Sequence, residues 1–434
     1  MKYYSFPYGG ISYNDLTAPQ RSSTVDAFLP VLSVIPLGNS FQGRVYPLVS
    51  VGEIVREGML VGRASVSGTA NVHATVPGRV IRKVLWKDRD GIENDGIVVR
   101  MEGSFEKLGR KSESLPWLGL GSFDLQKIIS DFGIVEMENS GRPLVEMFSA
   151  FRKESKKQTL VVRCVFDDPW LAADYALCRD RLKTVVEGSV ITARACSKIS
   201  QIIFAVSRYE KKLGEELLFE ASNWDIPSAL VLTGSRYPQR NSRELDLALR
   251  AYEKKERLDL GSFLFLGPAV LAAVHDAVKY RKPILDRYVA VGGSAVKYPR
   301  ILKARIGTRI GDLIEQCGGF IEKPFRITVG SPFFGREVMY LDEPLGKTCY
   351  AIAAMSKAQT AAHGQRSCIN CGECRAVCPM GLDPQNIYKR IETYGIKKAG
   401  KTGCHGCGCC KIVCPSALPL SETILKINPE VTFA

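Results

Sequence analysis

The chain has 434 residues, of which 45% are hydrophobic and 24% are charged, and its formal net charge is +14. It contains no run of about 18 apolar residues and no signal-peptide core at its start, so we expect no membrane span and a cytoplasmic location. Lys and Arg are dispersed along the chain and form no recognisable nucleic-acid motif, so nucleic acid is not an expected partner.

The stretch from residue 35 to residue 105 predicts a small β-sandwich. It is rich in valine and in alternating apolar positions, and glycines mark its turns. The string resembles a biotinyl/lipoyl-like sandwich, and we expect this domain to cover residues 1–112. The hairpin SVSGTANV has no lysine to which a prosthetic group could be attached, so we favour a structural module over a carrier domain.

Three further domains are expected after the β-sandwich. In residues 113–286, strand-length apolar runs alternate with runs whose apolar residues recur every three or four positions, which predicts an α/β domain with a parallel sheet. Residues 287–350 predict strands around one short helix, as in a β-grasp module. Residues 351–434 predict a helical domain that is interrupted by two cysteine runs.

The cysteines of the last domain indicate bound metal. Nine of the fourteen cysteines lie between Cys368 and Cys414, in a chain without an export signal. They form two runs of the pattern C-x2-C-x2-C-x3-C-P, the spacing of two-cluster bacterial ferredoxins, in which the fourth cysteine of each run ligates the other cluster. The expected ligands are Cys368, Cys371, Cys374 and Cys414 for the first 4Fe-4S cluster, and Cys404, Cys407, Cys410 and Cys378 for the second.

Zinc is the alternative for thiolate ligands. Zinc sites commonly use two separated C-x2-C pairs, whereas two four-cysteine runs that each end in Cys-Pro are typical of paired 4Fe-4S clusters, which we favour. His405 lies between two ligands of the second cluster and is expected to be a neighbour rather than a ligand. The other cysteines are expected to be packed residues: Cys164, Cys178, Cys196, Cys317, Cys349 and Cys409.

Four stretches resemble the C subunit of the Rnf complex, a membrane-bound, ion-translocating electron pump, and its relatives among cobalamin reductases and sodium-pumping quinone reductases. They are VSVGEIVREGMLVG with HATVPGRV; RYPQ at residues 236–239; HDAVKYRKPILDRYVAVGGSAVKYP through GTRIGDLIEQCGG and VGSPFFGRE; and the two cysteine runs. The cysteine runs are the most specific. Together the stretches cover all four expected domains in the family's order.

The resemblance implies a peripheral subunit on the cytoplasmic face of the inner membrane. Such a subunit takes electrons from NADH through bound FMN and passes them through two 4Fe-4S clusters to membrane subunits. The α/β domain would resemble the NADH-binding flavoprotein of respiratory complex I, and the β-grasp module an SLBB domain. Residues 350–434 contain ten Lys or Arg against five Asp or Glu, which suits an acidic ferredoxin or flavodoxin as a further partner. The resemblance assigns no catalytic residue in this chain.

The sequence departs from the family at the nucleotide-binding loop, which in the family is of the type GIVGLGGAGFPT. Its counterpart here is GIVEMENSGRPL, in which Glu136, Glu138 and Asn139 replace glycines and Gly141 remains. Such glycines let backbone N–H groups approach phosphate. Two like charges about 4 Å apart repel by about 4 kcal/mol at an effective dielectric of about 20, so carboxylates here argue against phosphate binding.

Two other nucleotide-site elements are also altered. Asp168 and Pro169 remain from an acidic strand end, and the family's YPQG has become YPQR, with Arg240 in place of glycine. Either the usual site for NADH and FMN is lost, which we favour, or a flavin is bound through altered contacts. We therefore do not expect NADH dehydrogenase activity of the chain itself.

Two alternatives to the Rnf-type function remain at this stage. One is a soluble flavin and iron–sulfur reductase of the cobalamin-reductase kind, which shares these domains but reduces a small molecule. The other is a scaffold whose clusters only hold the C-terminal fold together.

Overall fold

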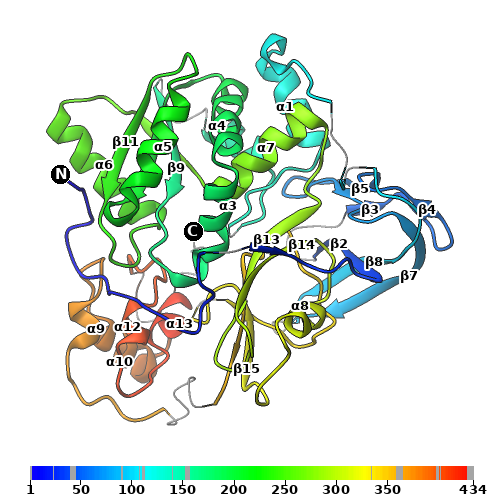
Figure 1. Ribbon diagram of the computed structural model, residues 1–434. Coiled ribbons are helices and arrows are strands. Elements are labelled where there is room, and N and C mark those ends of the chain that lie inside the picture. Colours follow the sequence, from blue (N-terminus) through cyan, green and yellow to red (C-terminus); the bar gives the residue numbers. More distant parts are fainter. Residues whose placement is uncertain are drawn as a thin grey trace.

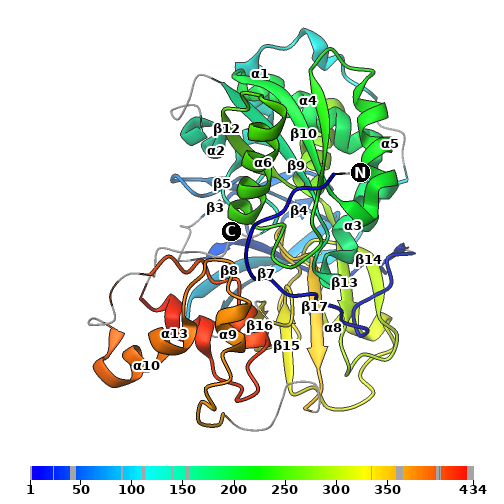
Figure 2. The same ribbon diagram turned by 90° about the vertical axis from the view of Figure 1, so that its left-hand side faces the viewer.

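The computed structural model of the chain is shown as a ribbon in Figures 1 and 2. It describes residues 2–22, 24–39, 45–88, 91–106, 108–109, 113–138, 140–151, 157–333, 335–357, 365–396, 400 and 402–427. Asn139, one of the loop residues singled out above, lies outside these ranges. No helix within them is both long enough and apolar enough to cross a membrane.

Two small antiparallel sheets form the N-terminal β region. The first consists of β2 (Leu32–Asn39), β8 (Glu93–Met101), β7 (Gly78–Lys87) and β4 (Ile54–Val55), and the second of β3 (Val45–Pro47), β5 (Leu60–Ala64) and β6 (Val72–His73). Alternate residues point inward, so that Val61, Val80 and Val99 are fully buried in one shared core. The hairpin SVSGTANV connects β5 to β6.

The α/β region contains a four-stranded parallel sheet, as expected, and helices cover both of its faces. Its strand order is β11 (Ser228–Thr233), β10 (Ile199–Ser207), β9 (Gln158–Cys164) and β12 (Ser262–Leu266). Its helices are α1 (Ser122–Asp131), α2 (Leu144–Phe151), α3 (Ala172–Asp180), α4 (Leu182–Cys196), α5 (Lys211–Ala221), α6 (Ser242–Glu256) and α7 (Pro268–Tyr280), and its short 3-10 helices are η1 (Trp117–Gly119), η2 (Pro169–Leu171) and η3 (Arg208–Glu210).

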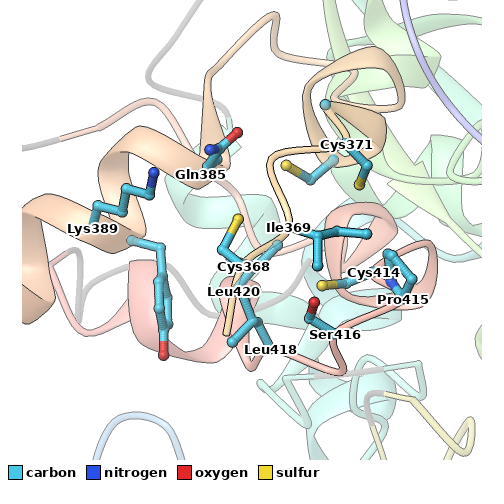
Figure 3. A pocket seen from close by; sticks show the side chains of 13 residues that line it. Cys368, Ile369, Cys371, Gln385, Lys389, Cys414, Pro415, Ser416, Leu418 and Leu420 are labelled. Carbon is cyan, nitrogen blue, oxygen red and sulfur yellow. The ribbon is translucent and has the colours of Figure 1, made fainter. Parts of the chain in front are cut away.

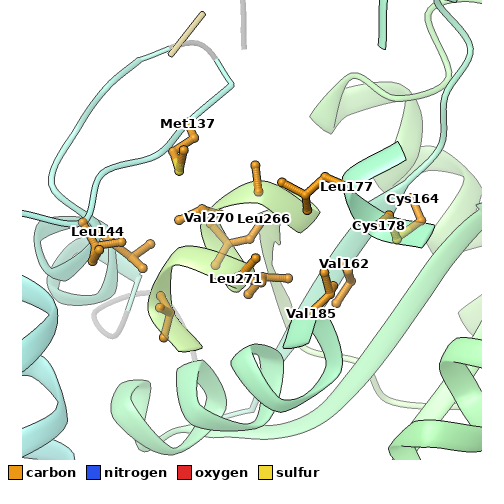
Figure 4. Close-up of a cluster of buried hydrophobic side chains, with 14 of the residues drawn as sticks. Met137, Leu144, Val162, Cys164, Leu177, Cys178, Val185, Leu266, Val270 and Leu271 are labelled. Atoms are coloured by element: carbon orange, nitrogen blue, oxygen red, sulfur yellow. The ribbon is translucent and has the colours of Figure 1, made fainter. Parts of the chain in front are cut away.

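The pattern of β9 explains why helices cover both faces of this sheet. All seven of its residues are buried, which is typical of a central parallel strand. Leu160 and Val162 pack into the larger cluster with residues of α4, α5 and α7, whereas Val161 packs with residues of α6 on the other face. Figure 4 shows part of the larger cluster, which contains Val162 of β9 and Leu271 of α7.

The next region is a six-stranded mixed sheet with one helix. Its strand order is β1 (Thr24–Asp26), β14 (Arg300–Arg305), β13 (Asp286–Gly292), β17 (Ala351–Met355), β15 (Arg326–Val329) and β16 (Arg336–Glu337), and α8 (Ile310–Gln316) packs against it. The core of this region includes Val289, Leu302 and Leu313, which are at most 1% exposed.

The C-terminal region contains only short helices among its described residues. They are α9 (Glu373–Ala376), α10 (Pro384–Tyr394), α12 (Cys409–Ile412) and α13 (Leu420–Leu425). In Figures 1 and 2 they form an orange and red group below the α/β region and beside the six-stranded sheet. The helix α10 begins where the side chain of Asp383 accepts a hydrogen bond from the backbone N–H of Asn386.

Two segments differ from the expected domain limits. Residues 351–355, expected to open the helical domain, instead form β17 inside the six-stranded sheet, because their buried backbone pairs with β13 and β15. The first residues of the chain do not belong to the β-sandwich. The backbone N–H of Tyr4 donates a hydrogen bond to the backbone oxygen of Leu232 in β11, and β1 pairs with β14.

Candidate functional site

The two cysteine runs fold in the same way. Gly372 and Gly408 both have positive φ angles, of 79° and 70°, and each is followed by a four-residue helix, α9 or α12, that contains the third cysteine of its run. A left-handed turn of this kind favours glycine, because a Cβ atom is strained there. The fourth cysteine follows the helix in both runs, so the repeat seen in the sequence is also a structural repeat.

Four thiols from both runs line one pocket. Cys368, Cys371 and Cys374 of the first run meet Cys414, the fourth cysteine of the second run, and Cys378 is not part of this lining. Figure 3 shows the side chains of Cys368, Cys371 and Cys414 around the pocket. The remaining walls are largely apolar, with Ile369, Tyr388, Leu418 and Leu420 among them. The structure therefore brings together the four residues expected for the first cluster.

The other four thiols interact with one another. Burial raises the pKa of Cys404 to about 11, and the neighbouring thiols of Cys407 and Cys378 contribute in the same direction. Burial also raises the pKa of Cys410, helped by Cys407, Cys404, Cys378 and Cys374. Cys374 belongs to the first pocket, so these interactions do not separate the two groups, and the place of Cys378 in the second group stays a prediction.

The donor chemistry of both groups suits iron–sulfur clusters. Each group offers four soft thiolate ligands, and the crossed membership is that of paired 4Fe-4S clusters. Within the described ranges, His, Cys, Asp and Glu side chains form no group of three or more arranged to hold a metal ion. The eight residues therefore fit iron–sulfur clusters in the type of their donor atoms, and the four cysteines of the first pocket also line one common space.

The six cysteines expected to be packed residues are all buried and in no disulfide. The sulfur atoms of Cys164 and Cys178 lie 3.7 Å apart in the core of the α/β region. Cys409 is fully buried, and its sulfur lies 3.9 Å from the backbone oxygen of Tyr237.

In the altered nucleotide loop, the side-chain carboxylate of Glu136 binds backbone N–H groups of the loop itself. Glu136 accepts hydrogen bonds from the backbone N–H groups of Glu138 and Ser140, both at 2.7 Å, and from the Ser140 hydroxyl at 2.9 Å. In a glycine-rich loop such N–H groups are available to a phosphate. Here an anion that belongs to the chain already takes them.

The second carboxylate of the loop is held by two arginines. Glu138 is buried and forms ion pairs with Arg163 and, at 2.7 Å, with Arg240. Burial raises the pKa of Glu138, and the two arginines oppose this shift. Arg240 lies 3.4 Å from Asp174, and Arg287 approaches Asp174 from the other side at 3.5 Å. Glu136 also contributes to the raised pKa of Glu138, so the two carboxylates still repel each other, but backbone donors and arginines inside the chain offset this repulsion.

The position of Glu138 also leaves no room beside α7. Gly267 is the N-cap of α7, and a Cβ atom built on it would lie 1.4 Å from Oε1 of Glu138. The carboxylate therefore packs directly on the backbone at a helix N-terminus, which is a favourable place for an anion. Met137 and Leu144, from the middle and the end of the loop, belong to the apolar cluster that also contains residues of α7 (Figure 4). These described residues do not fit a flavin phosphate.

The remaining expected elements of the nucleotide site have structural roles. Asp168 caps η2 by accepting a hydrogen bond from the backbone N–H of Trp170 at 2.9 Å, and burial raises its pKa to about 6. The guanidinium of Arg240 donates to the backbone oxygens of Arg163 and Val165 at 2.9 and 3.1 Å. The sequence analysis identified Glu138 and Arg240 as separate departures from the family and did not predict that they pair. The replacement of two family glycines by residues of opposite charge was the feature that could have indicated the pair.

Matches to protein families agree with this architecture. Residues 129–256 match the Nuo51 FMN-binding domain, residues 288–342 match the SLBB domain, and residues 362–422 and 338–383 match 4Fe-4S dicluster domains. These matches confirm the multidomain α/β layout and the expected 4Fe-4S cofactors. They define the class as an iron–sulfur protein with a dicluster domain joined to Nuo51-type and SLBB domains.

Curated relatives extend the similarity to most of the chain. The C subunit of the ion-translocating oxidoreductase complex of Rhodobacter capsulatus is 29% identical over 411 residues, which cover 91% of this chain and 76% of the relative. The C subunit of the proton-translocating ferredoxin:NAD(+) oxidoreductase complex of Clostridium ljungdahlii is 26% identical, with coverage of 87% and 82%. The chain is a homologue of these C subunits, which confirms the resemblance seen in its motifs.

A solved structure of an NAD+-reducing [NiFe]-hydrogenase in the H2-reduced state is similar to 74% of this chain at 12% identity, with a TM-score of 0.49. The chain spans 64% of the length of that hydrogenase chain.

Proposed function

We propose that the chain is an electron-transfer subunit of a membrane-associated, ion-translocating oxidoreductase complex of the Rnf type. The observation that carries this proposal is the single pocket in which Cys414 of the second run joins Cys368, Cys371 and Cys374 of the first. Crossed ligation of this kind holds two clusters close together, which suits the passage of single electrons from a donor to an acceptor.

The proposed ligands follow the two groups of thiols. The first 4Fe-4S cluster would be held by Cys368, Cys371, Cys374 and Cys414, and the second by Cys404, Cys407, Cys410 and Cys378. Bound clusters supply one-electron redox chemistry, while the protein sets their potentials through burial and hydrogen bonds to sulfur.

The usual site for NADH and FMN is proposed to be closed. Three observations support closure: Glu136 occupies the N–H groups of the loop, Glu138 is neutralised by Arg163 and Arg240, and its carboxylate packs against Gly267. A flavin phosphate would have to displace a buried ion pair as well as the side chains themselves. Electrons would therefore reach the clusters from a protein donor, such as an acidic ferredoxin or flavodoxin, rather than from NADH.

The proposed partners are the membrane subunits of the complex, and the proposed location is the cytoplasmic face of the membrane. The Rhodobacter and Clostridium relatives are named as C subunits of translocating complexes, which supports this placement. We further propose that the N-terminal β region is lipoyl-like in fold without a carrier function, because the loop between β5 and β6 has no lysine.

Anaerobic purification followed by analysis of iron, sulfide and flavin tests the proposal. We expect about eight irons per chain, little flavin, and no bleaching of cluster absorbance by NADH, whereas a reduced ferredoxin bleaches it. Zinc in place of iron would overturn the cluster assignment. Stoichiometric flavin with rapid bleaching by NADH would overturn closure of the nucleotide site and leave the clusters intact.

Two single substitutions separate ligands from packed cysteines. Cys371→Ala removes an exposed thiol of the first pocket and is expected to lower the iron content by up to about four atoms. Cys409→Ala removes a buried thiol that is not a proposed ligand, so the iron content is expected to stay the same. Equal losses in the two variants would contradict the ligand assignment.

A further inference from the structure

The second cysteine group is covered by a turn and a helix of the α/β region. The hydroxyl of Tyr237 donates to the backbone oxygen of Cys407 at 3.0 Å, and the sulfur of Cys409 lies 3.9 Å from the backbone oxygen of Tyr237. The helix α6 begins five residues later, with Glu244 in its first turn. The loop of the second cluster is therefore in contact with residues that lie far away in the sequence.

A buried carboxylate and an imidazole meet at this contact. Glu244 is fully buried, and its Oε1 lies 3.2 Å from Nε2 of His405, which is itself mostly buried. In the described part of the chain, neither oxygen of the Glu244 carboxylate and neither ring nitrogen of His405 has a regular hydrogen-bond partner. Buried polar groups are normally paired, so two such groups beside a cofactor site require a partner.

His405 also lies between Cys404 and Cys407, two proposed ligands of the second cluster, in the sequence. Its Nε2 faces Glu244, whereas its Nδ1 is buried and has no hydrogen-bond partner among the described residues. An imidazole held by a carboxylate on one side can donate from its other nitrogen to sulfur. The carboxylate–imidazole–sulfur arrangement resembles the way carboxylates orient histidines at metal sites.

We infer that His405, oriented by Glu244 across the domain contact, donates a hydrogen bond to sulfur at Cys407 and raises the reduction potential of the second cluster. This inference rests on the proposed function, because it requires a cluster at this site. A hydrogen bond to sulfur stabilises the added negative charge of the reduced state more than the oxidised state. His405 is thus a positioning residue for electron transfer and not a ligand.

No imidazole is among the described residues that line the pocket of the first cluster. Those side chains include Gln385 and Lys389, but both turn to Asn370, whose Oδ1 accepts from Gln385 and, at 3.0 Å, from Lys389. The inferred donor therefore acts on one cluster of the pair. It would make the second cluster easier to reduce than the same cluster in a chain that lacks the imidazole.

A redox titration of the anaerobic full-length chain, followed by EPR at one pH, tests the inference. His405→Leu is expected to shift the reduction equilibrium of the second cluster at least tenfold toward the oxidised state, or 59 mV for a one-electron couple. His405→Gln, which keeps a donor, is expected to shift it less. The signal of the first cluster, identified by its loss in Cys371→Ala, serves as the internal control. An unchanged second cluster, or equal shifts in both clusters, would overturn the inference.

A double-mutant cycle tests the role of Glu244. If Glu244 acts only through its charge, Glu244→Gln will shift the potential of the second cluster equally whether residue 405 is His or Leu. If it instead orients His405, Glu244→Gln will shift the potential differently in the two backgrounds. Equal shifts would refute the orienting role.

A second measurement needs no substitution. The chain contains four histidines, and pulsed EPR of the reduced protein labelled with 15N-histidine is expected to show a weak 15N coupling on the second cluster. Wild-type protein with clusters but without this coupling would refute the inference alone. Wild-type protein without clusters would refute the proposed function instead.

Discussion

The buried pair of Glu138 and Arg240 offers a quantitative test of the altered loop. The guanidinium of Arg240 lies 2.7 Å from the Glu138 carboxylate and is 10% exposed, so both charges lie away from water. Charges about 4 Å apart attract by about 4 kcal/mol at an effective dielectric of about 20. Removing one partner also leaves the other buried without it, and breaking such a pair costs about 3–5 kcal/mol.

We therefore expect Arg240→Ala to lower the free energy of unfolding of the α/β region by about 3–5 kcal/mol. Glu138→Ala should cost a similar amount, and the double variant should cost at least about 2 kcal/mol less than the sum. Urea unfolding followed by tryptophan fluorescence reports on this region, because Trp117, Trp170 and Trp224 lie in it. Costs that add within about 0.5 kcal/mol would refute the pairing.

An exposed ion pair supplies the matched control. Arg309 lies 2.7 Å from Asp312 three residues away, but the two side chains are 39% and 33% exposed. Arg309→Ala is therefore expected to cost no more than about 1 kcal/mol. A comparable cost at Arg309 and Arg240 would show that burial does not decide the effect.

Three further outcomes are expected. Cys378→Ala should remove the EPR signal of the second cluster, although Cys378 belongs to the first run, and leave that of the first. Gly267→Ala should destabilise the chain by at least about 2 kcal/mol because the added Cβ atom overlaps with Glu138. Thermal melts should show that most of this cost is relieved when Gly267→Ala is introduced into a chain that already carries Glu138→Gly. Burial raises the pKa of Glu187, but hydrogen bonds from His275 and Lys279 outweigh burial and lower this pKa to about 2. The ionised Glu187 therefore stabilises the fold above pH 4.5, and this contribution disappears as the pH falls toward 2. Glu187→Gln should make the free energy of unfolding less dependent on pH between these values.

The presence of 4Fe-4S clusters could be predicted from the sequence because its information is local, whereas the assignment of each ligand stays a prediction. The spacing of each run places three thiols on one turn and carries the fourth away behind a short helix, as Gly372 and Gly408 permit. The crossed grouping needs only the repetition of this unit. No long-range contact has to be known in advance, apart from the meeting of the two runs.

The nucleotide loop could be only half predicted. The loss of its glycines was visible in the sequence, but the partner of Glu138 lies 102 residues away, next to the strand β9 that carries Arg163. The expected repulsion treated both carboxylates as free charges, whereas the fold gives one of them backbone donors and the other two arginines. Pairing of this kind depends on the order of the strands in the sheet, whereas the apolar pattern indicates only the class of the fold.

The domain limits failed for a related reason. Residues 351–355 have the composition AIAAM, which suits a helix as well as a strand, and only the open position between β13 and β15 selects the strand. The three-residue strand β1 is also too short to be seen as a strand in the sequence, and it exists because β14 offers an edge.

Closure of the nucleotide loop, as proposed, would change what the α/β region can contribute to electron transfer. Its contacts with the cysteine-rich region, among the described residues, include those at the second cysteine group through Tyr237 and Glu244. Both residues lie near Arg240 in the sequence, so one segment neutralises the altered loop and also covers the proposed second cluster. If the proposed function holds, this segment would be required for it even without a nucleotide-binding glycine, because a shift of this turn would expose Cys407 and release His405.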